Sequence, residues 1–166
     1  FSLTDEAVKN FDPNMKVNPP LRLPEDVAAL KQALADGTLD CIATDHAPHT
    51  LEDKELGFDA APFGISGLET AFGLAMTELV HRKVLTLPQL VDKMSQSPAR
   101  IVGLAQKGAV KEGFDADLTI VDLDASWEVR KKDFKSKGKN SPFFGRTLKG
   151  EVLATICGGK VVFEKE

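Results

Sequence analysis

Apolar and polar positions follow two different periods along this chain. Up to about residue 106, apolar residues recur every three to four positions, which is the spacing of helices with one buried face. After Gly108 they recur at every second position, which is the spacing of half-buried strands. We therefore predict an α/β protein in which residues 1–106 form the larger part and residues 107–166 a small β-strand-rich appendage.

The first predicted helix covers residues 24–36. Pro24 suits the first turn of a helix, Val27, Leu30 and Leu34 share one face, and Gly37 supplies the stop. Further helices are expected over residues 66–82, from Thr86 onward, and from Ser97 onward. The second has an apolar side made of Leu68, Phe72, Ala75, Met76 and Leu79. Capping boxes are expected to start two of these helices, formed by Ser66 with Glu69 and by Thr86 with Gln89.

Four short segments have the pattern of strands. Residues 39–43 are nearly continuous in apolar character, as in a buried strand of a parallel sheet. Residues 117–123, 151–157 and 160–164 alternate, and Gly158-Gly159 has the composition of a two-residue hairpin turn. Residues 131–150 are expected to form a long loop.

Composition and charge exclude two classes of partner. The 166 residues carry a formal net charge of −4 with acids and bases interspersed, so a nucleic-acid partner is not expected. The basic cluster at residues 130–139 is interpreted as a solvated loop, with an anion contact as the alternative. No apolar run approaches the roughly 20 residues of a membrane span. Cys41 and Cys157 are expected to be buried free thiols of a cytoplasmic protein.

The candidate chemistry lies directly after the strand-like run at residues 39–43. Asp45, His46 and His49 follow it, and reactive groups of α/β proteins gather where such strands end. From the residues alone, Asp45 is either a metal ligand or proton carrier or a cap of the following turn, and the histidines are either functional or structural. Pro48 excludes a helical His-x-x-His metal pair, and His81 is expected on the surface. A catalytic zinc needs at least three protein ligands, so this chain does not supply a complete metal site.

Several segments in this order resemble the dihydroorotases, closest to the bacterial class I type within the amidohydrolase superfamily. They are Asn18-Pro19-Pro20-Leu21-Arg22, Thr44 to His49, Ala61-Pro62-Phe63-Gly64, Gly67 to Thr70 and Gly113 to Leu118. The resemblance covers the whole chain. It implies a (β/α)8 metal-dependent hydrolase barrel of roughly 250 residues or more with a β-sandwich tail. This chain, which has neither an initiator Met nor a signal-peptide pattern, would be the C-terminal part.

The resemblance also implies roles for individual residues. Asp45 corresponds to the aspartate that ligates one zinc of a two-metal centre and carries the proton. His49 and Asn18 correspond to substrate-binding residues, and Phe63 and Gly64 to a pair whose backbone holds the substrate. The other zinc ligands would lie outside this chain, so residues 1–166 alone are expected to be inactive.

The implied reaction is the reversible, zinc-dependent hydrolysis of the cyclic amide of dihydroorotate to N-carbamoyl-L-aspartate, a step of de novo pyrimidine (UMP) biosynthesis. A homodimer and association with aspartate transcarbamoylase are the expected partnerships, besides the small-molecule substrate. Two alternatives stay open. One is another cyclic amidohydrolase, a hydantoinase or allantoinase, against which the segments at residues 18–22 and 61–64 argue. The other is a non-catalytic partner of aspartate transcarbamoylase that has lost its metal ligands.

Overall fold

The computed structural model describes residues 1–165 as a set of helices beside one antiparallel sheet. The α-helices are α1 (Pro24–Asp36), α2 (Leu51–Lys54), α3 (Leu68–Ala75), α4 (Leu87–Val91) and α5 (Ser97–Ile101). Two π-helical segments, η3 (Met76–Val80) and η4 (Asp92–Gln96), extend α3 and join α4 to α5. The 3-10 turns are η1 (Asp5–Val8), η2 (Pro13–Met15) and η5 (Lys131–Asp133), and the strands are β1 (Leu118–Glu128), β2 (Thr147–Cys157) and β3 (Lys160–Glu164).

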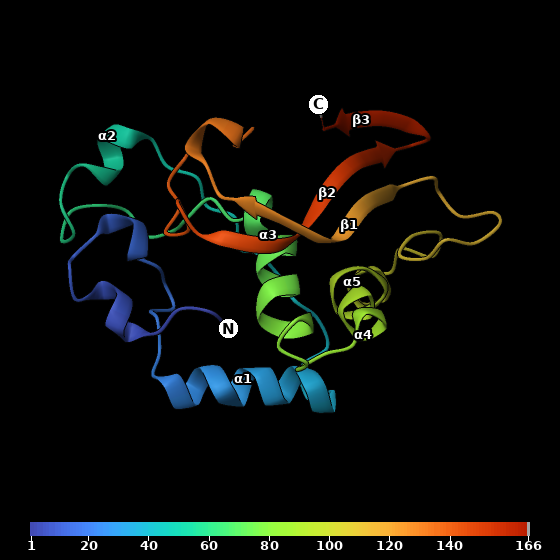
Figure 1. Cartoon of the computed structure of the whole chain (residues 1–166), viewed down its shortest axis with the longest axis horizontal. Helices are drawn as coiled ribbons and strands as arrows, with labels where there is room; N and C mark the ends of the chain where they lie inside the picture. The colour runs from blue at the N-terminus through green and yellow to red at the C-terminus, as the bar shows by residue number, and fades with distance from the viewer. Residues whose placement is uncertain (166) are drawn as a thin grey trace.

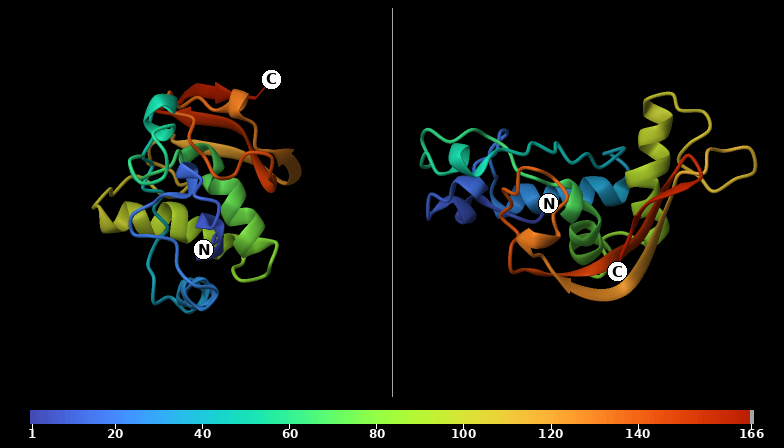
Figure 2. Two further views of the ribbon diagram at one scale, coloured as in Figure 1. Left: turned by 90° about the vertical axis from the view of Figure 1, so that its left-hand side faces the viewer. Right: turned by 90° about the horizontal axis from the view of Figure 1, so that it is seen from above.

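Helix α3 lies between the sheet and α1 (Figures 1 and 2). On one side, Ala75, Met76 and Leu79 of α3 and η3 pack with Leu34 of α1 in a buried cluster. On the other side, Leu74 joins a second cluster with residues of the sheet and of the segment before β2, namely Val129, Phe134, Phe143 and Leu148. The two clusters place α3 at the centre of the described fold.

A buried carboxylate also connects these layers. Glu78 of η3 is 4% exposed and pairs with Lys31 of α1 at 3.2 Å, Arg82 at 3.1 Å and Arg146 at 3.3 Å. A charge this buried is costly unless it is paired, so these three contacts make Glu78 compatible with the core.

Most of the predicted helices are confirmed. Helix α1 has the predicted bounds and ends at Gly37, whose φ is 88°. The capping box of Thr86 with Gln89 is present at the start of α4. The prediction of the buried side of the second helix is partly wrong. Met76 and Leu79 are buried, but Leu68 in the first turn is 59% exposed.

The sheet matches the sequence pattern: β3 has the predicted bounds, while β1 and β2 are longer than predicted. Strand β2 is central and pairs antiparallel with β1 and β3, in the order β1-β2-β3. The predicted hairpin turn joins β2 to β3, with φ of 56° at Gly158 and 75° at Gly159. The predicted loop of residues 131–150 is too long, since β2 already begins at Thr147.

The predicted strand at residues 39–43 is wrong for this structure. No residue of the described chain pairs with it in a ladder. Leu39 N–H donates to the Ala33 carbonyl of α1 at 2.9 Å, and the other backbone bonds of the run go to Lys93 of η4. Lys93 Nζ donates to the Leu39 carbonyl at 2.5 Å, and Ile42 N–H donates to the Lys93 carbonyl at 2.9 Å. An apolar run forms a strand only beside another strand, and this run has a helical neighbour.

Two other expectations need correction. The interrupted basic cluster is not simply a solvated loop, because Phe134 within it is 4% exposed and Asn140 and Ser141, which follow it directly, are also buried. Cys41 and Cys157 are free thiols as predicted, but Cys41 is half-buried and Cys157 is exposed at the end of β2.

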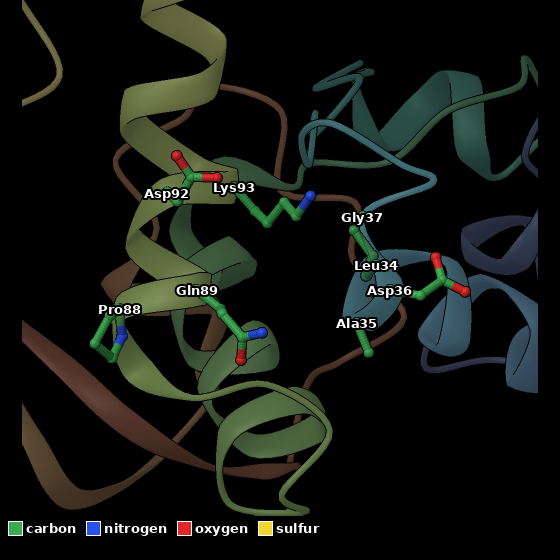
Figure 3. Close-up of a pocket in the computed structure, with 8 residues that line it drawn as sticks. All are labelled: Leu34, Ala35, Asp36, Gly37, Pro88, Gln89, Asp92 and Lys93. Atoms are coloured by element: carbon green, nitrogen blue, oxygen red, sulfur yellow. The ribbon is translucent and has the colours of Figure 1, made fainter.

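A hollow of about 400 Å³ lies between the end of α1 and the start of α4 (Figure 3). Leu34 and Gly37 line it from one side, and Gln89 and Lys93 from the other, with the Lys93 side chain pointing across the gap. None of its lining residues belongs to the segments predicted to carry chemistry, so the hollow is distinct from the candidate site.

Within residues 1–165, no helix combines the length and apolar character that crossing a bilayer requires. The division into residues 1–106 and 107–166 stays a prediction.

Candidate functional site

Asp45 lies on an exposed segment between α1 and α2, in an unusual backbone conformation. Its φ is 44°, in the left-handed region that residues other than glycine rarely adopt. The carboxylate is exposed and makes no hydrogen bond or ion pair with any residue from 1 to 165. Residues with a strained backbone cluster at functional sites, and such a conformation persists only where surrounding contacts hold it.

The next residue supplies such contacts. His46 Nδ1 accepts hydrogen bonds from the backbone N–H groups of Gly67 at 3.0 Å and Leu68 at 3.3 Å. The Nδ1 atom therefore carries no proton, and Nε2, which lies 3.4 Å from Ser136 Oγ, carries it. His46 also forms a parallel bridge with Ile65. The side chain thus caps the N-terminus of α3 from 21 residues away and fixes the backbone beside Asp45.

The capping box predicted for this helix is absent. The N-cap residue is Gly67, without a side-chain cap of its own. The Ser66 hydroxyl donates to the Gly138 carbonyl at 2.5 Å, with Asn140 Oδ1 at 3.1 Å as a second, longer acceptor of the same proton. Glu69 Oε1 accepts from Ser136 Oγ at 2.5 Å. Both side chains of the expected box are engaged by the segment before β2, which leaves the helix N–H groups for His46.

His49, Phe63 and Gly64 meet at one place, as the predicted site requires. His49 Nε2 donates to the Phe63 carbonyl at 2.8 Å, because a carbonyl can only accept. Gly64 has a φ of 122°, and a Cβ there would lie 2.5 Å from Ala47 Cβ and 3.2 Å from His49 Nε2. Only glycine allows this approach, so the Gly64 backbone can pack directly against the segment that follows Asp45.

Several backbone groups of the Phe63–Gly64 pair are already engaged. Gly64 N–H donates to the Lys16 carbonyl at 2.9 Å, and the Gly64 carbonyl accepts from Asn140 Nδ2 at 3.0 Å. Phe63 N–H has no partner among the residues that the structure describes, and the Phe63 ring is 53% exposed. The Phe63 N–H is therefore the backbone donor of this pair that is free to contact a ligand.

Asn18 is not in contact with the other predicted site residues. Its side chain is exposed and has no hydrogen bond within the described part of the chain. The bond from Gly64 to Lys16, two residues earlier, anchors its segment beside the site. Arg22, at the end of the same motif, lies 3.5 Å from Asp26 in an exposed pair. His81 is exposed as predicted, with Nε2 3.1 Å from the Leu123 carbonyl.

A hollow of about 550 Å³ opens beside His49 and Asn140 and is lined by several lysines, namely Lys54, Lys131, Lys137 and Lys139. Lys54 is buried, and its ammonium donates to the carbonyls of Pro13 at 3.0 Å and Pro62 at 2.8 Å. Burial, together with the nearby charge of Lys16, lowers the pKa of Lys54. The carbonyl contacts give Lys54 a structural role, holding η2 to the segment before Phe63, while the hollow itself has a positive lining.

Comparison with known proteins identifies the family of this chain. Residues 4–162 match the profile of the Amidohydrolase family. The chain belongs to the amidohydrolase family. It is 53% identical over 164 residues to a dihydroorotase of Endomicrobium trichonymphae and 57% identical over 164 residues to a dihydroorotase of Pelotomaculum thermopropionicum, covering 99% of this chain in each case. The matches span 39% and 38% of those relatives, so this chain corresponds to well under half of their length.

Solved structures of the family share the fold. An L-hydantoinase (dihydropyrimidinase) from Arthrobacter aurescens superposes with a TM-score of 0.91 at 38% identity, over 98% of this chain and 37% of that protein. A dihydropyrimidinase from Brevibacillus agri superposes with a TM-score of 0.90 at 26% identity, with the same coverage. The mixed helix and strand content predicted from the sequence is thus that of amidohydrolases.

The residues described here do not make up a metal centre. Across residues 1–165 the structure brings together no group of three or more His, Cys, Asp or Glu side chains that could hold an ion. Asp45 has the chemistry of one ligand, being an exposed carboxylate without a partner in that range. The described residues therefore offer one metal ligand, Asp45, and not the three or more protein ligands of a complete zinc site.

Sequence reasoning missed the residues that hold the site together. Asn140, Ser136 and Ser66 contact its two segments from the buried part of residues 134–146 and from the start of α3. Ser136 and Asn140 are small polar residues within the predicted loop of residues 131–150, where no periodicity marks them, and Ser66 was expected only to cap its own helix. Their burial arises from the tertiary packing of Phe134 and Phe143, which no local pattern reveals.

Proposed function

We propose that the protein to which this chain belongs is a dihydroorotase. The reaction would be the reversible hydrolysis of the cyclic amide of dihydroorotate to N-carbamoyl-L-aspartate, in de novo pyrimidine biosynthesis. The observation that supports this most directly is the meeting of the Asp45–His49 segment with Phe63 and Gly64, in a chain 57% identical to a dihydroorotase over 164 residues.

Asp45 is proposed to move the proton. Hydrolysis of a cyclic amide needs a base for the attacking water and an acid for the departing ring nitrogen, and one carboxylate can serve as both in turn. The free, exposed carboxylate of Asp45 is able to take and release a proton without first breaking a contact within residues 1–165. The left-handed backbone, held by His46, fixes where the carboxylate points.

The substrate contacts are proposed to come from His49, Asn18 and the Phe63–Gly64 pair. Because Nε2 of His49 donates to the Phe63 carbonyl, Nδ1 is the acceptor of the ring, has no partner in the described chain and suits a ring N–H of dihydroorotate. The backbone N–H of Phe63, beside Gly64, and the exposed amide of Asn18 are donors that suit the carboxylate and ring carbonyls.

We further propose that Asp45 is one ligand of a two-zinc centre whose other ligands come from outside residues 1–165. A bound zinc would polarise the amide carbonyl and lower the pKa of water. Residues 1–166 purified alone with added zinc are then expected to show no turnover. Zinc-dependent ring opening by this piece would contradict the ligand count.

The larger architecture is proposed on the same basis. We infer that the chain completes a (β/α)8 barrel and contributes β1–β3 to a β-sandwich in the intact protein, which would be a cytoplasmic homodimer. An association with aspartate transcarbamoylase, including the case of a non-catalytic partner, is tested by the activity measurement below together with co-purification.

A hydantoinase is the second candidate, favoured by the TM-score of 0.91 to an L-hydantoinase. Identity argues for the first candidate, being 57% to a dihydroorotase against 38% to that hydantoinase over nearly the whole chain. The intact protein should be assayed with dihydroorotate, hydantoin and allantoin. Preferred turnover of hydantoin or allantoin would overturn the proposal, and inactivity on all three would favour the non-catalytic partner.

The role of Asp45 has a direct test in the same assay. D45N keeps the size of the side chain and removes its capacity to carry a proton, so kcat is expected to fall by about a hundredfold or more. D40N is the matched control, since Asp40 is an exposed carboxylate five residues earlier with no site contact. Equal activity of D45N and D40N would overturn the assignment.

A further inference from the structure

The segment between η5 and β2 contributes one side chain to both halves of the candidate site. Asn140 is 4% exposed and follows His49 by 91 residues. Its Oδ1 atom accepts from His49 N–H at 2.8 Å and lies 3.1 Å from Ser66 Oγ, whose one proton is shared with the nearer Gly138 carbonyl. Its Nδ2 atom donates to the Gly64 carbonyl at 3.0 Å and, in a longer contact, to the Ala47 carbonyl at 3.5 Å. The oxygen and the nitrogen of this buried amide are therefore both engaged.

The backbone around Asn140 reinforces these contacts. Ser66 N–H donates to the Asn140 carbonyl at 2.8 Å. Two residues earlier, Gly138 lies so close to His49 that a Cβ on it would be 2.5 Å from the His49 carbonyl oxygen. This part of the chain is therefore fitted against the segment after Asp45 and does not merely pass over it.

Three contacts of the Asn140 amide reach the two segments that carry the proposed binding residues. Two of them reach the segment carrying His49, and one reaches Gly64, whose neighbour Phe63 presents the free N–H. Besides the capping bonds to His46, the described residues join these two segments directly through His49 Nε2 to the Phe63 carbonyl and Ala47 N–H to the Ile65 carbonyl. Asn140 is the buried group that bonds to both segments at once.

We propose that Asn140 is a positioning residue for substrate binding: its amide sets the distance between the His49 segment and the Phe63–Gly64 pair. This proposal rests on the proposed function, because it concerns the same substrate contacts. It assigns to the tail of the chain a part in substrate recognition, exerted through the backbone of two other segments. Asn140 itself does not touch the substrate.

The test compares two variants of Asn140 in the intact protein. N140A removes every contact of the amide, and N140D is isosteric but turns an oxygen toward the carbonyls of Gly64 and Ala47. Both are expected to raise KM for dihydroorotate by roughly tenfold or more while changing kcat by a smaller factor, because hydrogen bonds that hold the binding segments are lost. The KM effect of N140D is the sharper result, since this variant keeps the acceptor for His49 N–H.

Ser141 provides the matched control. It is adjacent, 3% exposed, and its Oγ accepts from Phe143 N–H at 3.3 Å, within its own segment. S141A is expected to lower Tm without changing KM. A KM that rises equally in S141A and in the Asn140 variants would overturn the positioning role, and so would an unchanged KM in N140D. If N140A fails to fold, N140D and S141A still make this comparison.

The outcomes separate this inference from the proposed function. An intact wild-type protein that does not hydrolyse dihydroorotate overturns the proposed function, whatever the variants do. An active wild type with no selective KM effect at residue 140 overturns only the positioning role. A selective rise in KM supports both.

Discussion

Helices α1 and α3 start in opposite ways. At α1, Pro24 occupies the first turn and Asp26 Oδ2 accepts from Leu23 N–H at 3.1 Å. The N-terminus of α1 is therefore capped by a residue of the same helix. At α3, the first N–H groups donate to His46, which lies in another segment, beside the candidate catalytic carboxylate. The first turn of α1 is thus capped by residues next to it in the sequence, whereas that of α3 is capped by the functional region. Substitutions around Asp45 should therefore destabilise the start of α3, and substitutions at the start of α3 should disturb the backbone around Asp45.

The largest effect is expected where the two segments approach most closely. G64A would place a Cβ at a φ of 122° and 2.5 Å from Ala47 Cβ, pushing the His46 segment away from α3. Strain and overpacking together should cost about 3 kcal/mol of unfolding free energy, measured by urea denaturation of the intact protein. G57A is the control, since Gly57 also has positive φ but nothing within 4 Å. An equal cost in the two variants would show that the close approach is unimportant.

Removing the remote cap is expected to have the next largest effect. H46L leaves the N–H groups of Gly67 and Leu68 without their acceptor, which should cost about 1–2 kcal/mol. It should also lower activity, because the backbone beside Asp45 loses its anchor. H46N, whose Oδ1 can replace Nδ1 as an acceptor, should recover part of both losses. If H46L and H46N behaved alike, the capping bonds would not be the reason for the effect.

A smaller, pH-dependent effect is expected at Glu69 in the first turn of α3. Burial raises the pKa of Glu69, but the hydrogen bonds from Ser136 Oγ–H and N–H outweigh it, so the pKa lies below its ordinary value. A lowered carboxyl pKa stabilises the fold above the unfolded-state pKa, and this contribution is lost as the pH falls through the folded-state pKa. S136A removes the hydroxyl bond and should cost about 1 kcal/mol at neutral pH.

The difference between wild type and S136A should therefore shrink as the pH is lowered below about 4.3, the unfolded-state value for glutamate. S126A, at an exposed position of β1, should show no such pH-dependent difference. A gap between S136A and wild type that stays constant down to acid pH would argue against the Glu69 contact as its cause.

The smallest effect is expected at the local cap of α1. D26A removes the acceptor for Leu23 N–H and a charge from the first turn, at a cost of about 0.5–1 kcal/mol. Activity should not change, since Asp26 makes no hydrogen bond or ion pair with the segment that carries Asp45. D26N retains the acceptor and should lie between D26A and wild type. A loss of activity in D26A equal to that in H46L would remove the distinction between the two helices.

The sequence pattern correctly predicted the features that depend on interactions between residues close together in the chain. The stop of α1 at Gly37, the capping box of α4 and the Gly158-Gly159 turn all depend on residues within a few positions of each other. The segments that resemble dihydroorotases also identified Asp45 and His49 as the candidates for chemistry, and the structure brings His49 to Phe63 and Gly64.

The predictions that failed concern side chains or backbone segments that had both a nearby and a distant hydrogen-bond partner available. Ser66 could have capped its own helix, yet its hydroxyl donates to the Gly138 carbonyl, 72 residues away. The apolar run at residues 39–43 could have paired with a strand, yet in this structure it bonds to Lys93. Sequence spacing shows which bonds a side chain is able to make locally, and the competing distant partner is visible only in the folded chain.

The sequence by itself therefore determined the family, the helix and strand types, and a carboxylate and imidazole at the end of an apolar run. These follow from composition, period and short motifs, which act over neighbouring residues. The tertiary structure alone decided that Asp45 adopts a left-handed backbone, that His46 caps α3, and that Asn140 joins the two site segments. Each of these depends on a buried hydrogen bond or a close approach between residues far apart in the chain, whose energy exists only once the layers around α3 have packed.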